Sequence, residues 1–146
     1  MLRIAIGSDH GGVDLKEEVF KHLKAKGYEV IDVGTNSHDS CHYPIYGAAV
    51  ADLVAKQECE FGIVICTSGE GIAIAANKVN GVRCGIGYND EVAKLMRQHN
   101  DANVISFGAK FMSNEEILRR TLIFLDTPFE GGRHQNRVQM ITDYEK

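Results

Sequence analysis

The sequence has no long run of basic residues and no long run of apolar ones. It carries 16 Lys and Arg against 20 Asp and Glu, a formal net charge of −4. Nucleic acid is therefore excluded as a partner, because phosphate neutralisation needs clustered cations. No stretch approaches the roughly 20 apolar residues that span a bilayer, so no membrane partner is expected. The apolar run near the N-terminus is too short for a signal peptide, which predicts a cytoplasmic protein.

Cysteine pairs with metal-ligand or redox spacing are also missing. Cys41, Cys59, Cys66 and Cys84 form no Cys-x-x-Cys pair, and no histidine stands at zinc-finger spacing from them. A disulfide framework is not expected in a non-secreted chain of this size. Taken alone, each cysteine is interpreted as a small buried hydrophobe, and no metal site is predicted.

The composition that remains is that of a globular protein, with 44% hydrophobic and 25% charged residues among 146. This length corresponds to one domain, which we expect to span residues 1–146. Short apolar runs alternate with segments of helical periodicity, such as Leu15, Val19 and Leu23, which end at Gly27. A capping box at Ser113-x-x-Glu116 starts a later helix.

These alternations predict strands and helices in regular succession. Strands are expected at 2–6, 28–33, 61–66, 82–87 and 103–107. Helices are expected before Gly27, at 45–56, at 72–79, at 90–99, after Ser113 and in the C-terminal tail. Five βα units without a linker predict an α/β fold, a three-layer Rossmann-like domain with helices on both faces of a five-stranded parallel sheet.

Two polar stretches leave strands at the position where such sheets bind ligands. With a strand order that begins 2-1-3, the ligand crevice lies beyond the carboxyl ends of the first and third strands. Asp9 and His10 follow the first strand, and Cys66 with the loop 67–71 ends the third. The sequence therefore predicts a site at this edge.

The loop 67–71 offers consecutive backbone N–H groups at a helix start, which favours anion binding. It lacks the Gly-Lys-Ser/Thr ending of a P-loop, and the first turn, GSDHGG, lacks the dinucleotide pattern. The alternative is a glycine-rich turn with no ligand. Cys66 beside the loop could act as a nucleophile with His10 as its base, or as a thiolate that removes a proton α to a carbonyl.

The C-terminal half holds two further polar groups. Arg133 and Arg137 are four residues apart, so a helix would place both guanidinium groups on one face, as suits a phosphate ligand. The alternative is a solvated face. His99 and Asn100 close the predicted helix 90–99, where a histidine can also simply interact with the helix dipole.

Six segments spread along the chain resemble one enzyme family, that of the ribose, galactose and allose phosphate isomerases. They are IGSDHGG at 6–12, EVIDVGT at 29–35, YP at 43–44, GIVICTSGEGIAIAANKV at 62–79, RQHNDANV at 97–104 and EGGRHQNRV at 130–138. The resemblance implies interconversion of an aldose phosphate and a ketose phosphate through a cis-enediolate. It also implies that neither a metal nor an organic cofactor is needed.

The resemblance assigns roles to individual positions. It makes Cys66 the catalytic base and His99 the acid/base that opens the furanose ring. Loop 67–71 becomes the anion hole. The remaining residues would bind the sugar or its phosphate: Asp9, His10, Tyr43, Thr67, Ser68, Gly69, Glu70, Gly71, Asn100, Lys110, Arg133 and Arg137.

Four positions depart from the family pattern. Thr67 and Ser68 replace the usual Gly-Thr after the cysteine, and Glu70 replaces an apolar residue beside the anion hole. We interpret Glu70 as an exposed first-turn acid favoured by the helix dipole rather than as the base. Lys110 replaces an arginine and can bind phosphate only as a point charge.

Three alternatives to a pentose phosphate isomerase stay open at this point. The tail with Arg133 and Arg137 favours a pentose phosphate, whereas HYPI at 42–45 resembles galactose 6-phosphate isomerase subunits, so a hexose 6-phosphate is the alternative. A non-catalytic phosphosugar-binding module would not need Cys66 and His99. A cysteine hydrolase is weakened by the missing nucleophile-elbow motif.

The topology also predicts the oligomeric state. Helices in a parallel α/β sheet run antiparallel to the strands, so His99 should lie at the edge opposite Cys66, about 17–20 Å away. We therefore expect a homodimer, or a dimer of dimers, in which a two-fold partner supplies His99 to a shared active site.

Overall fold

The computed structural model describes residues 2–146. The strands are β1 (Arg3–Ser8), β2 (Glu29–Asp32), β3 (Phe61–Cys66), β4 (Cys84–Ile86) and β5 (Val104–Gly108). The helices are the 3-10 helix η1 (His10–Gly12) and the α-helices α1 (Val13–Ala25), α2 (Tyr43–Ala55), α3 (Glu70–Asn77), α4 (Asp90–Gln98), α5 (Asn114–Asp126) and α6 (Arg133–Thr142). Among these, no helix has both the length and the apolar character needed to cross a bilayer.

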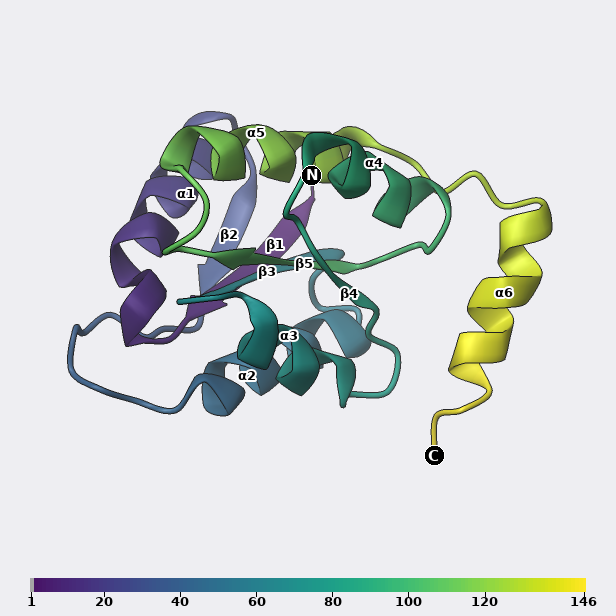
Figure 1. Ribbon diagram of the computed structural model, residues 1–146, viewed down its shortest axis with the longest axis horizontal. Coiled ribbons are helices and arrows are strands. Elements are labelled where there is room, and N and C mark those ends of the chain that lie inside the picture. The colour runs from purple at the N-terminus through teal and green to yellow at the C-terminus, as the bar shows by residue number, and fades with distance from the viewer. Residues whose placement is uncertain (1) are drawn as a thin grey trace.

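All neighbouring strands are parallel, in the order β2-β1-β3-β5-β4. Helices α1, α4 and α5 cover one face of the sheet and α2 and α3 cover the other, which gives three layers (Figure 1). The predicted fold class and the order beginning 2-1-3 are confirmed. The switch in strand order lies between β1 and β3, which places the carboxyl ends of these two strands at the crevice.

The central strand β3 packs on both faces of the sheet. Ile63 and Ile65 are fully buried among the side chains of α1, α4 and α5, whereas Val64 and Cys66 face α2 and α3. This alternation is what a strand in the middle layer requires, because successive side chains point to opposite faces. It follows that Cys66 leaves the sheet on the side of α3.

Polar side chains fix where several helices begin. The Asp9 carboxylate accepts from the Gly11 N–H before η1, and Asn89 caps α4. The capping box predicted at Ser113 and Glu116 is present, with both reciprocal hydrogen bonds. These caps satisfy N–H groups that have no partner inside the helix.

The bounds of most elements differ by one or two residues from those predicted, and three of the differences are instructive. Helix α2 begins at Tyr43 rather than at residue 45, because Pro44 fits the first turn of a helix, where its missing N–H is not needed. Helix α3 covers Glu70–Asn77 and so starts two residues before the predicted 72–79. Strand β4 keeps just the middle of the predicted 82–87, since it lies at the sheet edge and pairs with β5 alone.

Helix α6 stands beside the β4 edge rather than on a face of the sheet (Figure 1). His134 and Val138 are its buried residues, whereas Met140 and Ile141 are exposed. Exposed apolar residues gathered on one outlying helix are typical of an interaction surface.

Candidate active site

The ends of β1 and β3 meet at the carboxyl edge of the sheet, as the sequence predicts. The Asp9 N–H donates to the carbonyl of Ile65, at 3.2 Å. A Cβ atom on Gly11 would lie 2.4 Å from Oγ1 of Thr67, so the close approach of these two segments favours glycine at position 11. The segment 9–11 and the loop 67–71 therefore form one continuous surface.

The loop 67–71 is a tight turn that contacts the end of β5. Gly69 has φ +81°, and a Cβ there would lie 2.9 Å from the backbone nitrogen of Gly108. The Ser106 hydroxyl donates to the Gly69 carbonyl at 2.6 Å. Helix α3 begins at the next residue, Glu70, whose side chain is exposed and whose N–H donates to the Ser68 hydroxyl. The turn thus presents N–H groups at a helix start, where negative charge is favoured.

The Cys66 side chain points into this turn. It is 5% exposed, and its Sγ accepts a hydrogen bond from the Gly69 N–H at 3.1 Å. Cys59 and Cys84 receive no such hydrogen bond. Burial raises the pKa of Cys84 to about 12, and burial followed by the nearby Glu60 carboxylate raises that of Cys59.

Two further predicted residues lie along the same edge. A Cβ on Gly71 would lie 2.6 Å from the ring of Tyr43 and 3.0 Å from its hydroxyl, so Tyr43 packs across the first turn of α3. His10 accepts the N–H of Cys41 at its Nδ1 atom, at 3.2 Å. Because Nδ1 is an acceptor, the proton of the neutral His10 ring belongs on Nε2, which leaves a donor for a ligand.

His99 and Asn100 lie at the opposite edge. They follow α4, which runs antiparallel to the strands, and they precede the start of β5. Gly62 pairs with Val104 at that end of the sheet, whereas Cys66 pairs with Gly108 four residues further on. Four residues of strand span about 13 Å. One chain therefore does not bring His99 to its own Cys66.

Hydrogen bonds from two arginines stabilise the turn that carries His99 and Asn100. Asp101 has φ +47°, and its carboxylate accepts from Arg97 at 2.9 Å and from Arg83 at 3.3 Å. Arg83 also donates to the backbone carbonyl of Asn100. These contacts fix a left-handed residue that would otherwise be disfavoured.

The remaining predicted residues are exposed cations. Arg133 and Arg137 lie one turn apart on α6, which confirms the predicted helix. Lys110 follows β5, and its N–H donates to the carbonyl of Thr67, so it stands beside the loop 67–71. The predicted site thus divides into two groups. One surrounds Cys66 at the carboxyl edge, and the other joins His99 to α6 at the far edge.

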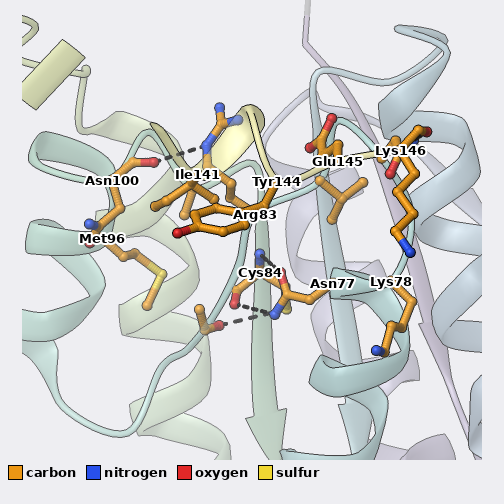
Figure 2. Close-up of a pocket in the computed structure, with 14 residues that line it drawn as sticks. Asn77, Lys78, Arg83, Cys84, Met96, Asn100, Ile141, Tyr144, Glu145 and Lys146 are labelled. Carbon is orange, nitrogen blue, oxygen red and sulfur yellow. Dashed lines mark hydrogen bonds between the residues drawn. The ribbon is translucent and has the colours of Figure 1, made fainter. Parts of the chain in front are cut away.

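A pocket of about 730 Å³ lies away from Cys66, between β4, α3, α4 and the end of α6 (Figure 2). Asn100, Arg83, Cys84 and Tyr144 are among its lining residues, and Asn100 is its one member of the predicted site. The pocket therefore does not describe the surroundings of the thiol.

The sequence interpretation missed three residues next to the predicted site. Cys41 contacts His10, and His134 stacks on His99 with ring centroids 4.3 Å apart and an angle of 14°. Glu130 lies within 3.9 Å of His99 and 3.5 Å of His134. The spacing of Glu130 and His134, four residues apart, is the one local signal that could have indicated this cluster.

Comparison with known proteins gives consistent results over the whole chain. The family described as Ribose/Galactose Isomerase matches residues 4–141. Ribose-5-phosphate isomerase B of Escherichia coli K12 is 45% identical over 146 residues, which cover 100% of this chain and 98% of that protein.

Solved structures of related proteins have the same fold as this chain. Clostridium thermocellum ribose-5-phosphate isomerase B superposes with a TM-score of 0.96 at 46% identity, covering 97% of this chain and 96% of that one. The Mycoplasma genitalium enzyme, solved with bound ribulose-5-phosphate, superposes with a TM-score of 0.94 at 41% identity, covering 97% and 95%.

The fold and the carboxyl-edge site define a doubly wound α/β protein with a buried thiol beside the start of a helix. Within that class, the chain belongs to the Ribose/Galactose Isomerase family, a family of enzymes. The resemblance seen in the sequence is thereby confirmed.

Proposed function

We propose that the chain interconverts ribose 5-phosphate and ribulose 5-phosphate, without a resident metal or organic cofactor. The observation that carries this proposal is the Cys66 thiol, hydrogen-bonded by the Gly69 N–H inside the turn that starts α3. It is supported by the relatives named ribose-5-phosphate isomerase B and by the homologue with bound ribulose-5-phosphate.

The proposed chemistry is a proton transfer between adjacent carbons. The Cys66 thiolate removes the proton from C2 of the open-chain aldose, and the electron pair of the C–H bond passes to the C1 carbonyl. The resulting cis-enediolate would carry its negative charge beside the loop 67–71, where the start of α3 favours negative charge. A proton then moves from the C2 hydroxyl to the C1 oxygen, and the electron pair left on the C2 oxygen forms the C2 carbonyl as C1 takes back the proton from the Cys66 thiol. This yields the ketose and restores the thiolate.

We further propose that the active site is shared between two copies of the chain. His99 would open the furanose ring at the partner's Cys66, and Asn100 would accompany it. The separation of His99 from Cys66 within one chain supports this assignment. The exposed apolar residues Met140 and Ile141 on α6 support a dimer, or a dimer of dimers, because such residues are usually covered.

The charged side chains would hold the phosphate. Arg133 and Arg137 of one copy would form charge-assisted contacts from one face of α6, and His10 with Lys110 of the other copy would approach from the side of the loop 67–71. Asp9 and Tyr43 would line the sugar. Glu70, exposed at the start of α3, has no role in this mechanism.

The test is an isomerase assay on ribose 5-phosphate, allose 6-phosphate and galactose 6-phosphate, each with and without a chelator. We expect turnover of the pentose phosphate that chelation does not reduce. Turnover of a hexose phosphate alone would assign the alternative substrate, and binding without turnover would indicate a non-catalytic module. Activity abolished by the chelator would contradict the metal-free mechanism.

The Cys66→Ser variant tests the base in the same assay. It should keep the fold and the binding of phosphorylated ligand but lose most isomerisation, because a serine hydroxyl is too weak an acid to ionise near neutral pH. Circular dichroism and ligand binding provide the controls. Near-normal turnover would place the base elsewhere, with Glu70 examined next through Glu70→Gln.

A further inference from the structure

Two histidines and a glutamate converge at the far edge of the sheet. The Nε2 atom of His99 lies 3.9 Å from Oε1 of Glu130, and the Nε2 atom of His134 lies 3.5 Å from the same oxygen. One ligand atom from each of the three residues lies within 4.8 Å of the others. This is the residue set that a zinc-like dication prefers.

The cluster is built by contacts between distant parts of the chain. The Glu130 N–H donates to the carbonyl of Gln98, which fixes the turn against the end of α4. Gly131 and Gly132, with φ of +68° and +56°, then form the turn that leads from Glu130 into α6. His134 is buried at 8% exposure, whereas the side chains of His99 and Glu130 are 40% and 50% exposed. The buried His134 is thus fixed in place, whereas the half-exposed side chains of His99 and Glu130 can move toward an ion.

We propose that His99, Glu130 and His134 form an inhibitory binding site for a divalent transition-metal ion of the zinc type. Zinc bonds of 2.0–2.2 Å place tetrahedral ligands about 3.3 Å apart, and the present separations of 3.5 and 3.9 Å need small closures. Water would complete the coordination. The two histidine nitrogens, which lie within 4.8 Å of one another, must also approach, and this requires the His99 ring to turn. With three protein ligands and cationic Arg133 next to His134, the site binds more weakly than a structural four-ligand site.

Binding would displace His99 from the position it has now. The two imidazole rings are stacked at 14°, and parallel rings cannot both direct a lone pair at one ion. Because His134 is buried, the half-exposed His99 ring turns and its Nε2 lone pair is taken up by the metal. His99 can then neither accept nor donate a proton. The metal binding does not depend on the proposed function, whereas the inhibition rests on it.

The binding test uses Zn²⁺ in titration calorimetry and Co²⁺ in visible absorption, both on the full-length protein. We expect one Zn²⁺ per chain and a tetrahedral or five-coordinate Co²⁺ spectrum without thiolate charge-transfer bands. Glu130→Gln and His134→Gln should each lower the affinity by at least about tenfold, since even outer-shell partners of metal ligands contribute that much.

His38 provides the matched control. Its Nε2 lies 2.8 Å from the Asp14 carboxylate in an exposed pair on the other side of the fold, so it has the same chemistry without a third ligand. The His38→Gln variant should bind Zn²⁺ as the unmodified protein does. Equal affinity in all four proteins, no Zn²⁺ binding, or thiolate bands in the Co²⁺ spectrum would overturn the proposal.

An activity measurement then separates the two claims. Zn²⁺ should inhibit turnover reversibly, and EDTA should restore it. Half-inhibition in the Glu130→Gln variant should need at least about tenfold more Zn²⁺, in line with its binding affinity. If Zn²⁺ binds at the cluster and turnover is unaffected, the inhibitory role is wrong. If the protein has no isomerase activity at all, the binding data still stand and it is the proposed function that fails.

Discussion

The sulfur of Cys66 lies in surroundings that differ from those of Cys59 and Cys84. Its Sγ receives a backbone N–H in a turn that opens toward the carboxyl edge of the sheet. Cys59 packs against α2 and β3, and Cys84 lies beside α3 at the start of β4. Burial raises the pKa of both thiols, and for Cys59 the nearby Glu60 carboxylate raises it further. The contrast distinguishes the thiol assigned to catalysis from those that fill space.

This contrast predicts the pattern of alkylation in the native protein. At pH 8 iodoacetamide should label Cys84 and Cys59 slowly, because a thiol with a raised pKa is almost entirely protonated there and the thiolate is the reactive form. Labelling of both should accelerate in urea. Peptide mapping by mass spectrometry measures each rate, and fast labelling of Cys84 in the folded protein would contradict its raised pKa.

Arg137 tests the phosphate assignment. The Arg137→Ala variant should weaken the binding of ribose 5-phosphate by about 1.5–3 kcal/mol, the value of a charge-assisted hydrogen bond, and leave the weak binding of free ribose unchanged. Lys21→Ala, which removes an exposed cation from α1, is the control for overall charge. Equal losses for the two sugars would make Arg137 a structural residue instead.

At the scale of elements, the turn between β3 and α3 depends on the absence of a side chain at Gly69. Gly69→Ala combines a φ of +81° with a Cβ placed 2.9 Å from the backbone of residues 107–108. Gly27→Ala has a φ of +95° but nothing within 4 Å, so it isolates the cost of the left-handed backbone, about 1–2 kcal/mol.

The two alanine variants should therefore differ. Gly69→Ala should lower the free energy of unfolding by clearly more than Gly27→Ala and should also reduce turnover, because the turn that holds Cys66 has to shift. Urea denaturation and the isomerase assay provide the two measurements. A loss of stability no larger than that of Gly27→Ala would show that the turn is not packed against the end of β5.

Most of the element order could be predicted from the sequence, because it depends on local patterns. The apolar run 61–66, the periodicity from Leu15 to Leu23 and the capping box at Ser113 each act within a few residues, and each element is present. The prediction of a site at the ends of β1 and β3 used a general rule about parallel sheets, and Asp9 and Cys66 do lie there.

The features that could not be predicted depend on distant contacts. The Glu130 N–H donates to the carbonyl of Gln98, more than thirty residues earlier in the sequence, and this contact brings His134 onto His99. Nothing in the local pattern of either segment specifies that approach. The same holds for the clamp of Arg83 on Asp101, which joins two loops at the sheet edge.

At the scale of the whole molecule, the two halves of the proposed active site lie at opposite edges of one sheet. We propose that the two halves meet in a dimer, with His99 of one copy at the partner's Cys66. Its central claim is thus that catalysis needs two chains. Variants in the two halves should complement one another only if this arrangement is correct.

The direct measurement mixes Cys66→Ser and His99→Asn proteins, each inactive alone, after dissociation and re-association. A mixed dimer would carry one site with both substitutions and one intact site. With random pairing half of the dimers are mixed, so isomerase activity should recover to roughly a quarter of the unmodified level. If both single variants are inactive and mixing restores no activity, the active site lies within one chain and the account is contradicted.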